Sequence, residues 1–452
     1  MNMLMKWMFS AAVLAVGAAA APALAGTLQV GPGKTYAKPC LAIAAAQAGD
    51  LIEVDAAGSY QGDTCAWATD NLTVRGVNGR AKIDITGVTP AQQKGLFTIT
   101  ANNATIENFE LSGAAISAGA GNSGAGIRHQ GTNLTVRGCY FHDNQNGILG
   151  APAAANTGTV LIESSEFASN GAGDGFSHNM YIGNYAQFTL QYSYTHSSKV
   201  GHLVKSRAYT SLIRYNRITD DAGGTGSYEV NLPNGGTGYI IGNLIEQSST
   251  TQNPAIIAFG EEGTTGYDDH LFVVNNTILN NLKTGTFVND SGTSPAMLIN
   301  NIFWNGGKIS GQASAVLTGN FDSTMGDPLF TDVTNFNVHL LAGSPCIDQG
   351  KAPGSNNTQS LQPSQEYVQP LSQISRSVAG AAIDIGAYEF QNPGAADGGG
   401  TSPDVDGGTG TGGSMVNGCG CVIGGVPMGA GPGGAVGAML GVAALVLRRR
   451  KR

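Results

Sequence analysis

One feature constrains the fold of this chain more than any other: a short β-branched segment recurs along most of its length. Each copy is a short segment rich in apolar and β-branched residues, and several copies end in Gly or Asn, as in residues 134–138 and 272–276. The anchor residues of nine copies are Val74, Ile106, Val136, Ile162, Leu190, Ile213, Ile240, Val273 and Leu298. Successive anchors lie 23 to 33 residues apart, which is the spacing of a solenoid repeat.

The residues within and between the copies favour strands and tight turns. β-branched residues favour strands, and Gly, Asn and Asp favour turns. No long helical period separates the copies, which argues against alternating βαβ units. Stacked coils of this kind bury a continuous apolar interior and pair as parallel strands. Asn216, Asn243, Asn276 and Asn301 each follow their anchor by three residues, so we expect their side chains to form a hydrogen-bonded ladder.

The overall composition agrees with a turn-rich solenoid and excludes other classes. Only 12% of the residues are charged, and Gly supplies 67 of the 452. The apolar content of 41% is enough for a core, which excludes a disordered chain. The sequence lacks the Gly-X-Y period of collagen, and its content of Glu, Lys, Arg and Leu is too low for a coiled coil.

The N-terminus has the pattern of a secretory signal. Lys6 is the only charge in residues 1–25, an apolar run covers residues 11–21, and Ala23 and Ala25 supply a small-x-small cleavage pattern. A first transmembrane helix is the alternative, but the run is short for one. We therefore predict a signal peptide over residues 1–25 and an exported protein.

The C-terminus combines four parts in a fixed order. Residues 391–418 are a Gly-rich spacer, Cys419 and Cys421 follow, residues 422–447 carry no charge, and residues 448–452 are all basic. The spacer cannot form a core, and the uncharged stretch is long enough to cross a bilayer with its basic end in the cytoplasm. We therefore predict a disordered linker over residues 391–418 and a single transmembrane helix within residues 419–452.

This arrangement resembles the tripartite MYXO-CTERM sorting signal. The resemblance implies a partner protease that cuts near Cys419 and Cys421 and leaves the protein at the cell surface or outer envelope. The alternative is a plain single-pass anchor. In both cases the working domain lies outside the cytoplasm.

The exported part of the chain is strongly acidic. Without Lys6 and the basic cluster of residues 448–452, 17 basic residues remain against 31 acidic ones, a net charge near −14. Bulk charge therefore excludes nucleic acid and anionic membrane as partners. We expect a monomer, and any local cluster of Lys and Arg becomes informative.

The first coil has its own signals. Residues 41–48 predict a short apolar helix before the strand at residues 51–54, as an N-terminal cap of the solenoid. Cys40 and Cys65 are close in sequence, and export permits disulfides, so we predict a bond between them. Cys139 and Cys346 are predicted to be separate buried thiols.

Several segments resemble a known family. Residues 31–36 and 47–54 are similar to the opening coil, and residues 327–330, 343–348 and 384–389 to the closing segment, of secreted right-handed parallel β-helix proteins with a pectate-lyase-like fold. The resemblance spans residues 28–390 and implies a β-helix domain over residues 26–390. It implies no single activity, because such folds carry lyases, hydrolases, esterases and non-catalytic adhesins.

A second strand precedes several anchors and carries the candidate site. Residues two apart on a strand share a face. If Met180, Val204, Ser206 and Tyr228 point inward, the side chains that form one outward patch over adjacent coils are Tyr181, Lys205, Arg207, Glu229 and Asn231. We expect His178 and His202 at its edge and Arg128 one or two coils below.

This patch suits eliminative cleavage of a uronic-acid polysaccharide. The reaction needs a group that neutralises the carboxylate and a base that removes the proton from the neighbouring carbon. It also needs an acid that protonates the leaving oxygen. Arg207 or Arg128 can bind the carboxylate. Lys205 is the candidate base if Arg207 lowers its pKa, with His202 as the alternative base and Tyr181 as the acid.

Other interpretations remain open at this point. Many β-helix lyases use Ca²⁺, and Glu229, Glu261, Glu262, Asp268 and Asp269 are oxygen ligands of the right type, although no spacing matches a compact calcium loop. The patch can equally be a solvated ion-pair ladder, or the binding face of an adhesin. A glycoside hydrolase would need paired carboxylates, such as Asp220 and Asp221, which can equally form a turn. No Gly-x-Ser-x-Gly motif supports a serine hydrolase.

Overall fold

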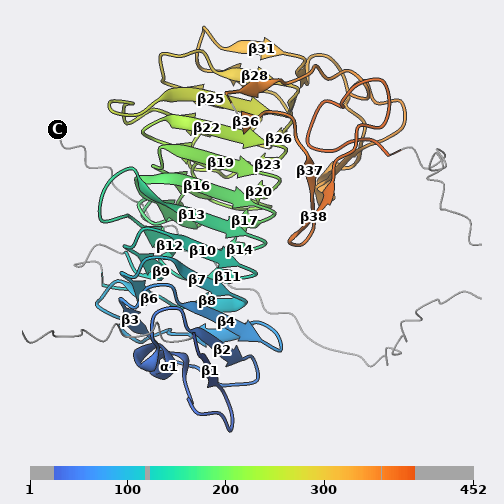
Figure 1. The fold of residues 1–452 in the computed structure, drawn as a ribbon. Coiled ribbons are helices and arrows are strands. Elements are labelled where there is room, and N and C mark those ends of the chain that lie inside the picture. The colour runs from blue at the N-terminus through green and yellow to red at the C-terminus, as the bar shows by residue number, and fades with distance from the viewer. Residues whose placement is uncertain (1–24, 118–122, 358, 392–452) are drawn as a thin grey trace, which may run out of the picture. The chain divides into compact units, whose positions relative to one another are not determined.

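The computed structural model describes residues 25–117, 123–357 and 359–391. The predicted signal peptide up to residue 24, most of the linker and the whole sorting segment lie outside these residues. No helix within the described ranges has the length and apolar character that crossing a bilayer requires. All described residues belong to one compact unit, which is a column of stacked coils (Figure 1).

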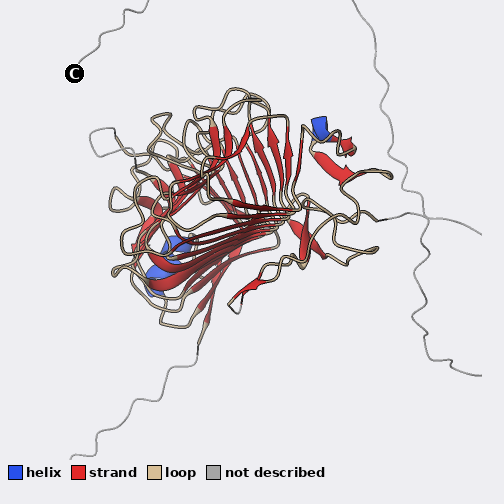
Figure 2. Cartoon of the chain, turned by 90° about the horizontal axis from the view of Figure 1, so that it is seen from above, coloured by secondary structure: helices blue, strands red, loops and turns tan. Residues whose placement is uncertain are grey.

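Three parallel sheets run along this column and enclose a common interior (Figure 2). The first, here called the anchor sheet, contains all nine predicted anchors. Its strands are β1 (Thr27–Val30), β2 (Leu51–Asp55), β4 (Thr73–Val77), β7 (Ala104–Glu107), β10 (Leu134–Arg137), β13 (Thr157–Glu163), β16 (Tyr185–Gln191), β19 (Thr210–Arg214), β22 (Gly236–Ile241), β25 (Asp269–Val274), β28 (Met297–Ile299) and β31 (Val316–Thr318).

The second sheet carries the candidate site and is here called the patch sheet. Its strands are β3 (Cys65–Trp67), β6 (Gly95–Ile99), β9 (Ala125–His129), β12 (Asn146–Gly150), β15 (Met180–Ile182), β18 (Val204–Ser206), β21 (Val230–Leu232), β24 (Ala255–Phe259), β27 (Thr286–Asp290) and β30 (Lys308–Ser310).

The third sheet closes the coil between the other two. Its strands are β5 (Ala81–Asp84), β8 (Phe109–Ser112), β11 (Tyr140–His142), β14 (Glu166–Ala168), β17 (Tyr194–His196), β20 (Arg217–Thr219), β23 (Leu244–Gln247), β26 (Thr277–Asn280), β29 (Ile302–Trp304) and β32 (Phe321–Asp322).

The predicted repeat is confirmed by the register of the anchor sheet. Each anchor lies directly opposite the next one, as Val136 does between Ile106 and Ile162. All nine anchors are fully buried. The variable spacing therefore comes from the turns, while the buried apolar position stays constant from coil to coil. The fold is a parallel β-helix, as the sequence predicted.

The predicted Asn ladder is also present, at the turns after the last four anchors. The Nδ2 of Asn216 donates to the Oδ1 of Asn243 at 3.0 Å, and the bonds Asn243–Asn276 and Asn276–Asn301 have the same length. The ladder extends one coil further to Asn320. The first four side chains are completely buried. The ladder therefore satisfies amide groups that would otherwise be costly to bury.

The N-terminal end is covered as predicted. Helix α1 spans Pro39–Ala45, with Ala42 and Ile43 buried against the first coil. Cys40 and Cys65 form the predicted disulfide, with Cα atoms 5.7 Å apart. Cys139 and Cys346 are separate buried thiols, also as predicted.

The C-terminal segment folds back beside the last coils as three antiparallel pairs (Figure 1). Its elements are β33 (Phe330–Asp332), the 3-10 helix η2 (Val333–Asn335), β34 (Asn337–Leu340), β35 (Ser355–Asn356), β36 (Gln359–Ser360), β37 (Gln365–Val368) and β38 (Ser372–Ser375).

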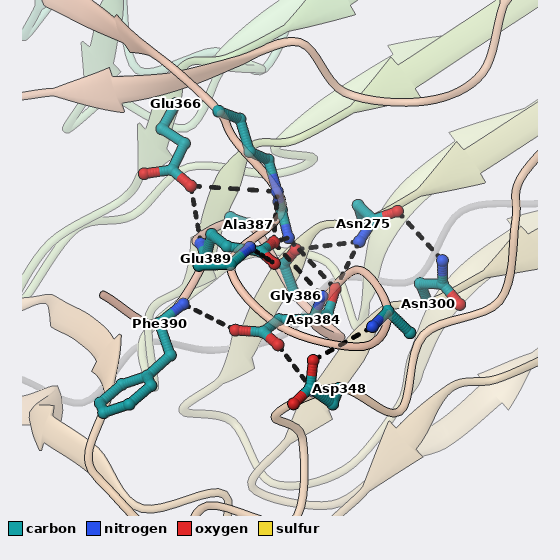
Figure 3. Close-up of polar contacts among 12 residues, drawn as sticks. Asn275, Asn300, Asp348, Glu366, Asp384, Gly386, Ala387, Glu389 and Phe390 are labelled. Carbon is teal, nitrogen blue, oxygen red and sulfur yellow. Dashed lines mark hydrogen bonds and ion pairs between the residues drawn. The ribbon is translucent and has the colours of Figure 1, made fainter. Parts of the chain in front are cut away.

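A buried polar network attaches this segment to the solenoid (Figure 3). The guanidinium of Arg376 binds Glu389 through two nitrogens, at 3.1 and 3.0 Å, and donates to the backbone oxygens of Asp384 and Gly386. Asn275 of the solenoid donates to the backbone oxygen of Asp384 at 2.8 Å. The family-like residues 384–389 therefore have a structural role: they dock the closing segment.

Candidate functional site

The outward row of the patch sheet brings the predicted residues into line. Tyr181 on β15 lies opposite Lys205 on β18, and Lys205 lies opposite Asn231 on β21. Leu149 on β12 separates Tyr181 from Arg128 on β9. The sequence analysis did not identify β12, so Arg128 lies two coils from Tyr181, at the far end of the expected range.

Lys205, Arg207 and Tyr181 form a connected group, here called the basic patch. The Nε of Arg207 donates to the hydroxyl of Tyr181 at 2.6 Å. The Nζ of Lys205 lies 5.2 Å from the centroid of the Tyr181 ring, and the guanidinium of Arg207 lies 5.5 Å from it. Both cations therefore lie within cation–π distance of the same aromatic ring.

Alternation along β18 explains why these side chains point outward. Val204 and Ser206 are buried in the interior, whereas Lys205 and Arg207 lie on the outer face. The side chain of Lys205 is only 11% exposed. This burial, together with the positive charge of Arg207, lowers the pKa of Lys205. A lysine with a lowered pKa is better suited to act as a base near neutral pH.

A pocket of about 500 Å³ opens beside the basic patch. Arg128, Tyr181 and Arg207 line it, together with Phe176 and Tyr267. Phe176 is 83% exposed, although Asp174 fixes its backbone N–H at 2.9 Å. An aromatic ring held out into solvent at the edge of a polar pocket can stack on the apolar face of a sugar ring.

Arg128 differs from the other cations of the pocket. Within the described residues no carboxylate pairs with it, and its buried Nε has no hydrogen-bond partner. Burial lowers the pKa of its guanidinium. A desolvated guanidinium without an anion favours an anionic ligand in this pocket.

The prediction that Glu229 belongs to the outward patch is wrong. Glu229 is completely buried, because β21 begins only at Val230 and the chain bends before it. The strand alternation therefore does not extend to residues 228 and 229, and Tyr228 lies on the partly exposed side instead.

His178 and His202 lie beneath the patch as a stacked pair with ring centroids 4.4 Å apart. Each Nδ1 accepts a backbone N–H, from His202 in the case of His178 and from Tyr228 in the case of His202. Burial lowers the pKa of both, that of His178 to about 3. A neutral imidazole with its acceptor nitrogen occupied cannot take a proton readily, so His202 is poorly placed as the alternative base.

The predicted calcium ligands have other partners. Glu261 accepts a hydrogen bond from Asn231, Glu262 pairs with Lys205 and Arg207, and Asp268 accepts from Thr237. Asp269 accepts from Thr293 and Ser294 instead. In the described part of the chain, no three acidic, His or Cys side chains gather closely enough to hold a metal ion. The arrangement therefore does not fit the expected Ca²⁺ site.

The glycosidase alternative has no open carboxylate pair at Asp220 and Asp221. Asp220 is fully buried, and burial raises its pKa to about 7. Asp221 adopts a left-handed turn conformation with φ of 59° and binds Arg217 and Tyr194. The two neighbouring aspartates therefore form a turn, the second of the two interpretations left open by the sequence.

A parallel β-helix with a pocket lined by Arg and Tyr on one of its sheets can be compared with solved structures. The fold is similar to that of pectate lyase Pel9A. The likeness covers 81% of this chain and 96% of that one, with a TM-score of 0.57 and 15% sequence identity. At this identity the comparison shows the fold alone.

Other comparisons add less. A pectin methylesterase from Aspergillus niger matches with a TM-score of 0.26, and Geobacillus virus E2 ORF18 with 0.33. No protein-family model and no curated protein sequence matches this chain.

Sequence reasoning did not select three residues of the site. Phe176 lies in a Gly-rich loop, Tyr267 in a turn and Asn234 in the connection after β21. The one available signal was at Phe176, the single large apolar residue in the Gly-rich run of residues 170–178.

Proposed function

We propose that this protein cleaves an acidic polysaccharide by β-elimination at the basic patch. The observation that carries the proposal is the pocket in which Arg128 lacks an anionic partner while Lys205, Arg207 and Tyr181 lie at its side. In a chain whose exported part has a net charge near −14, such a concentration of cations favours a polyanion. The pectate-lyase-like fold supports a polysaccharide as substrate.

Each step of an elimination has a candidate group in this arrangement. Arg207 binds the uronate carboxylate and stabilises the negative charge that builds up when the neighbouring carbon loses its proton. Lys205 accepts that proton on Nζ. The C–O bond to the leaving sugar then breaks, and a carbon–carbon double bond forms. The hydroxyl of Tyr181 accepts a hydrogen bond from Arg207, so its own proton can pass to the leaving oxygen.

A rate measurement on the Lys205→Ala variant tests this assignment. The domain of residues 26–390 is incubated with polygalacturonate and alginate, with and without Ca²⁺, and ultraviolet absorbance reports the unsaturated product. Loss of the base should lower the rate by about 10²–10⁴-fold. The matched control is Lys199→Ala, because Lys199 is an exposed lysine that pairs with Asp143 outside the pocket. A Lys205→Ala variant as fast as the control contradicts the assignment.

A glycan-binding adhesin is the second candidate, and the exposed ring of Phe176 favours it. Stacking on a sugar needs no catalytic base. On this alternative the wild type binds polyuronates without forming products, and Lys205→Ala changes only the affinity. For both candidates we infer that the protein acts at the cell surface. The secretion and sorting patterns of residues 1–25 and 419–452 support this location.

A further inference from the structure

The loop of residues 260–268 places a carboxylate on the basic patch. This loop connects β24 and β25, and the backbone N–H of Glu262 fixes it by donating to the oxygen of Pro233 at 2.9 Å. The Oε2 of Glu262 lies 2.7 Å from the Nη2 of Arg207, and its Oε1 lies 3.8 Å from the Nζ of Lys205. One carboxylate thus contacts both cations that the proposed reaction uses.

The carboxylate of Glu262 is more exposed to solvent than the side chains of Arg207 and Lys205. Glu262 is 47% exposed, whereas Arg207 is 22% and Lys205 is 11% exposed. The carboxylate therefore reaches the cations from the solvent side, as an incoming ligand would. An ion pair with one half-exposed partner contributes little to stability, so a second carboxylate can replace Glu262 without unfolding the loop.

The other contacts of Arg207 leave one position for a carboxylate. Its Nε is bonded to Tyr181 and its Nη1 to Asn234, and both partners are neutral groups. The third nitrogen of the guanidinium, Nη2, contacts the carboxylate of Glu262. A guanidinium fixed on two sides presents its third side in a defined direction, which suits selective binding of a carboxylate.

We propose that Glu262 occupies the place of the substrate carboxylate in the free protein, and that an acidic sugar unit displaces it. Arg207 is then the carboxylate subsite of the pocket, and Glu262 is a specificity-determining residue. A neutral sugar cannot displace it, because the guanidinium of Arg207 would lose its counter-charge. This inference rests on the proposed function for the identity of the ligand, but the contact itself is independent of it.

Binding of uronate oligomers measures the displacement. Glu262→Gln removes the internal competitor, so the dissociation constants of galacturonate and mannuronate hexamers should fall about two- to fivefold, the range expected for one exposed ion pair. Asp268→Asn is the matched control, because it removes the same charge from the same loop without contact to either cation. Equal or weaker binding by Glu262→Gln overturns the inference.

A second measurement needs no polysaccharide and separates this inference from the proposed function. Glu262 counteracts the lowered pKa of Lys205, so Glu262→Gln should speed acylation of Lys205 by a water-soluble succinimidyl acetate ester, followed by peptide mass spectrometry. Asp268→Asn should leave the rate unchanged. An unchanged rate in Glu262→Gln also overturns the inference. If acylation is faster but no variant binds the hexamers, the proposed ligand and function are contradicted. The contact of Glu262 with Lys205 is then still supported.

Discussion

At the scale of single residues, the interior of the solenoid holds carboxyl groups without counter-charges. Both oxygens of Glu229 and one of Asp220 are buried and have no hydrogen-bond partner within the described residues. Burial raises the pKa of Glu229 well above its usual range, and the nearby acids Asp220 and Glu246 raise it further. Burial also raises the pKa of both Asp220 and Glu246 to about 7. Protonation at neutral pH removes the cost of burying these charges.

These raised pKa values predict a stability that falls as the pH rises. The native state keeps protons on these carboxyl groups that the unfolded chain releases near pH 4. Their contribution to stability is therefore complete below about pH 4 and is lost as the pH rises through the pKa of the native state. The Glu229→Gln variant should lose less unfolding free energy than the wild type between pH 5 and pH 8. Each pKa unit is worth about 1.4 kcal/mol. Urea unfolding at several pH values measures the difference.

The exposed Glu261 supplies the control for this experiment. Its replacement by Gln should leave the slope of stability against pH as in the wild type. If Glu229→Gln and the wild type show parallel slopes, the carboxyl of Glu229 is not held protonated by burial.

The same residues show how far strand alternation predicts a site. It placed Tyr181, Lys205 and Arg207 on one face because β15 and β18 are regular at those positions. It misplaced Glu229, because a bend before Val230 interrupts the alternation. The residue at which a strand begins depends on its pairing with the neighbouring coils. It therefore could not be predicted from residues 227–231 alone.

At the scale of elements, the buried anchors and the Asn ladder were predictable because each coil repeats the same physical requirement. An inward apolar side chain recurs at all nine anchors, and a turn amide that pairs with the next coil recurs from Asn216 onward. Strand β12 was missed because Asn146–Gly150 contains two Gly residues among five. The loop that carries Phe176 was also beyond prediction, since hydrogen bonds from the backbone of Phe176 and Ser177 to Asp174, rather than any apolar pattern, fix its backbone.

At the scale of the whole molecule, the closing segment depends on one buried ion pair. The side chains of Arg376 and Glu389 are both fully buried, and Figure 3 shows Glu389 next to Glu366 and the 384–387 turn. The backbone also needs Gly386 here: its φ is 103°, and a Cβ would lie 2.7 Å from Ile302. The family-like residues 384–389 were recognised from the sequence, but their contacts to Asn275 and Asn300 span more than 80 residues and could not be predicted.

Removal of one partner should detach this segment. Glu389→Ala leaves the Arg376 guanidinium buried without its carboxylate, at a cost of about 3–5 kcal/mol. Thermal unfolding should show the loss, and limited proteolysis should cut within residues 350–390. The triple variant Arg376→Met/Glu389→Leu/Glu366→Gln removes the guanidinium and both buried carboxylates beside it, Glu389 at 3.0 Å and Glu366 at 3.9 Å, and should recover part of the stability. Equal proteolysis of Glu389→Ala and the wild type contradicts this role of the ion pair.

The origin of the oxygen in the products tests the central claim most directly. The domain is incubated with a defined uronate oligomer in H₂¹⁸O, and the products are weighed by mass spectrometry. Elimination adds no water to the substrate, so the product masses should sum to that of the oligomer, and one new end should be unsaturated without ¹⁸O from solvent. Two products whose masses sum to that of the oligomer plus one ¹⁸O-labelled water would identify a hydrolase, and an intact oligomer that stays bound would identify an adhesin. Either result would contradict β-elimination at the basic patch.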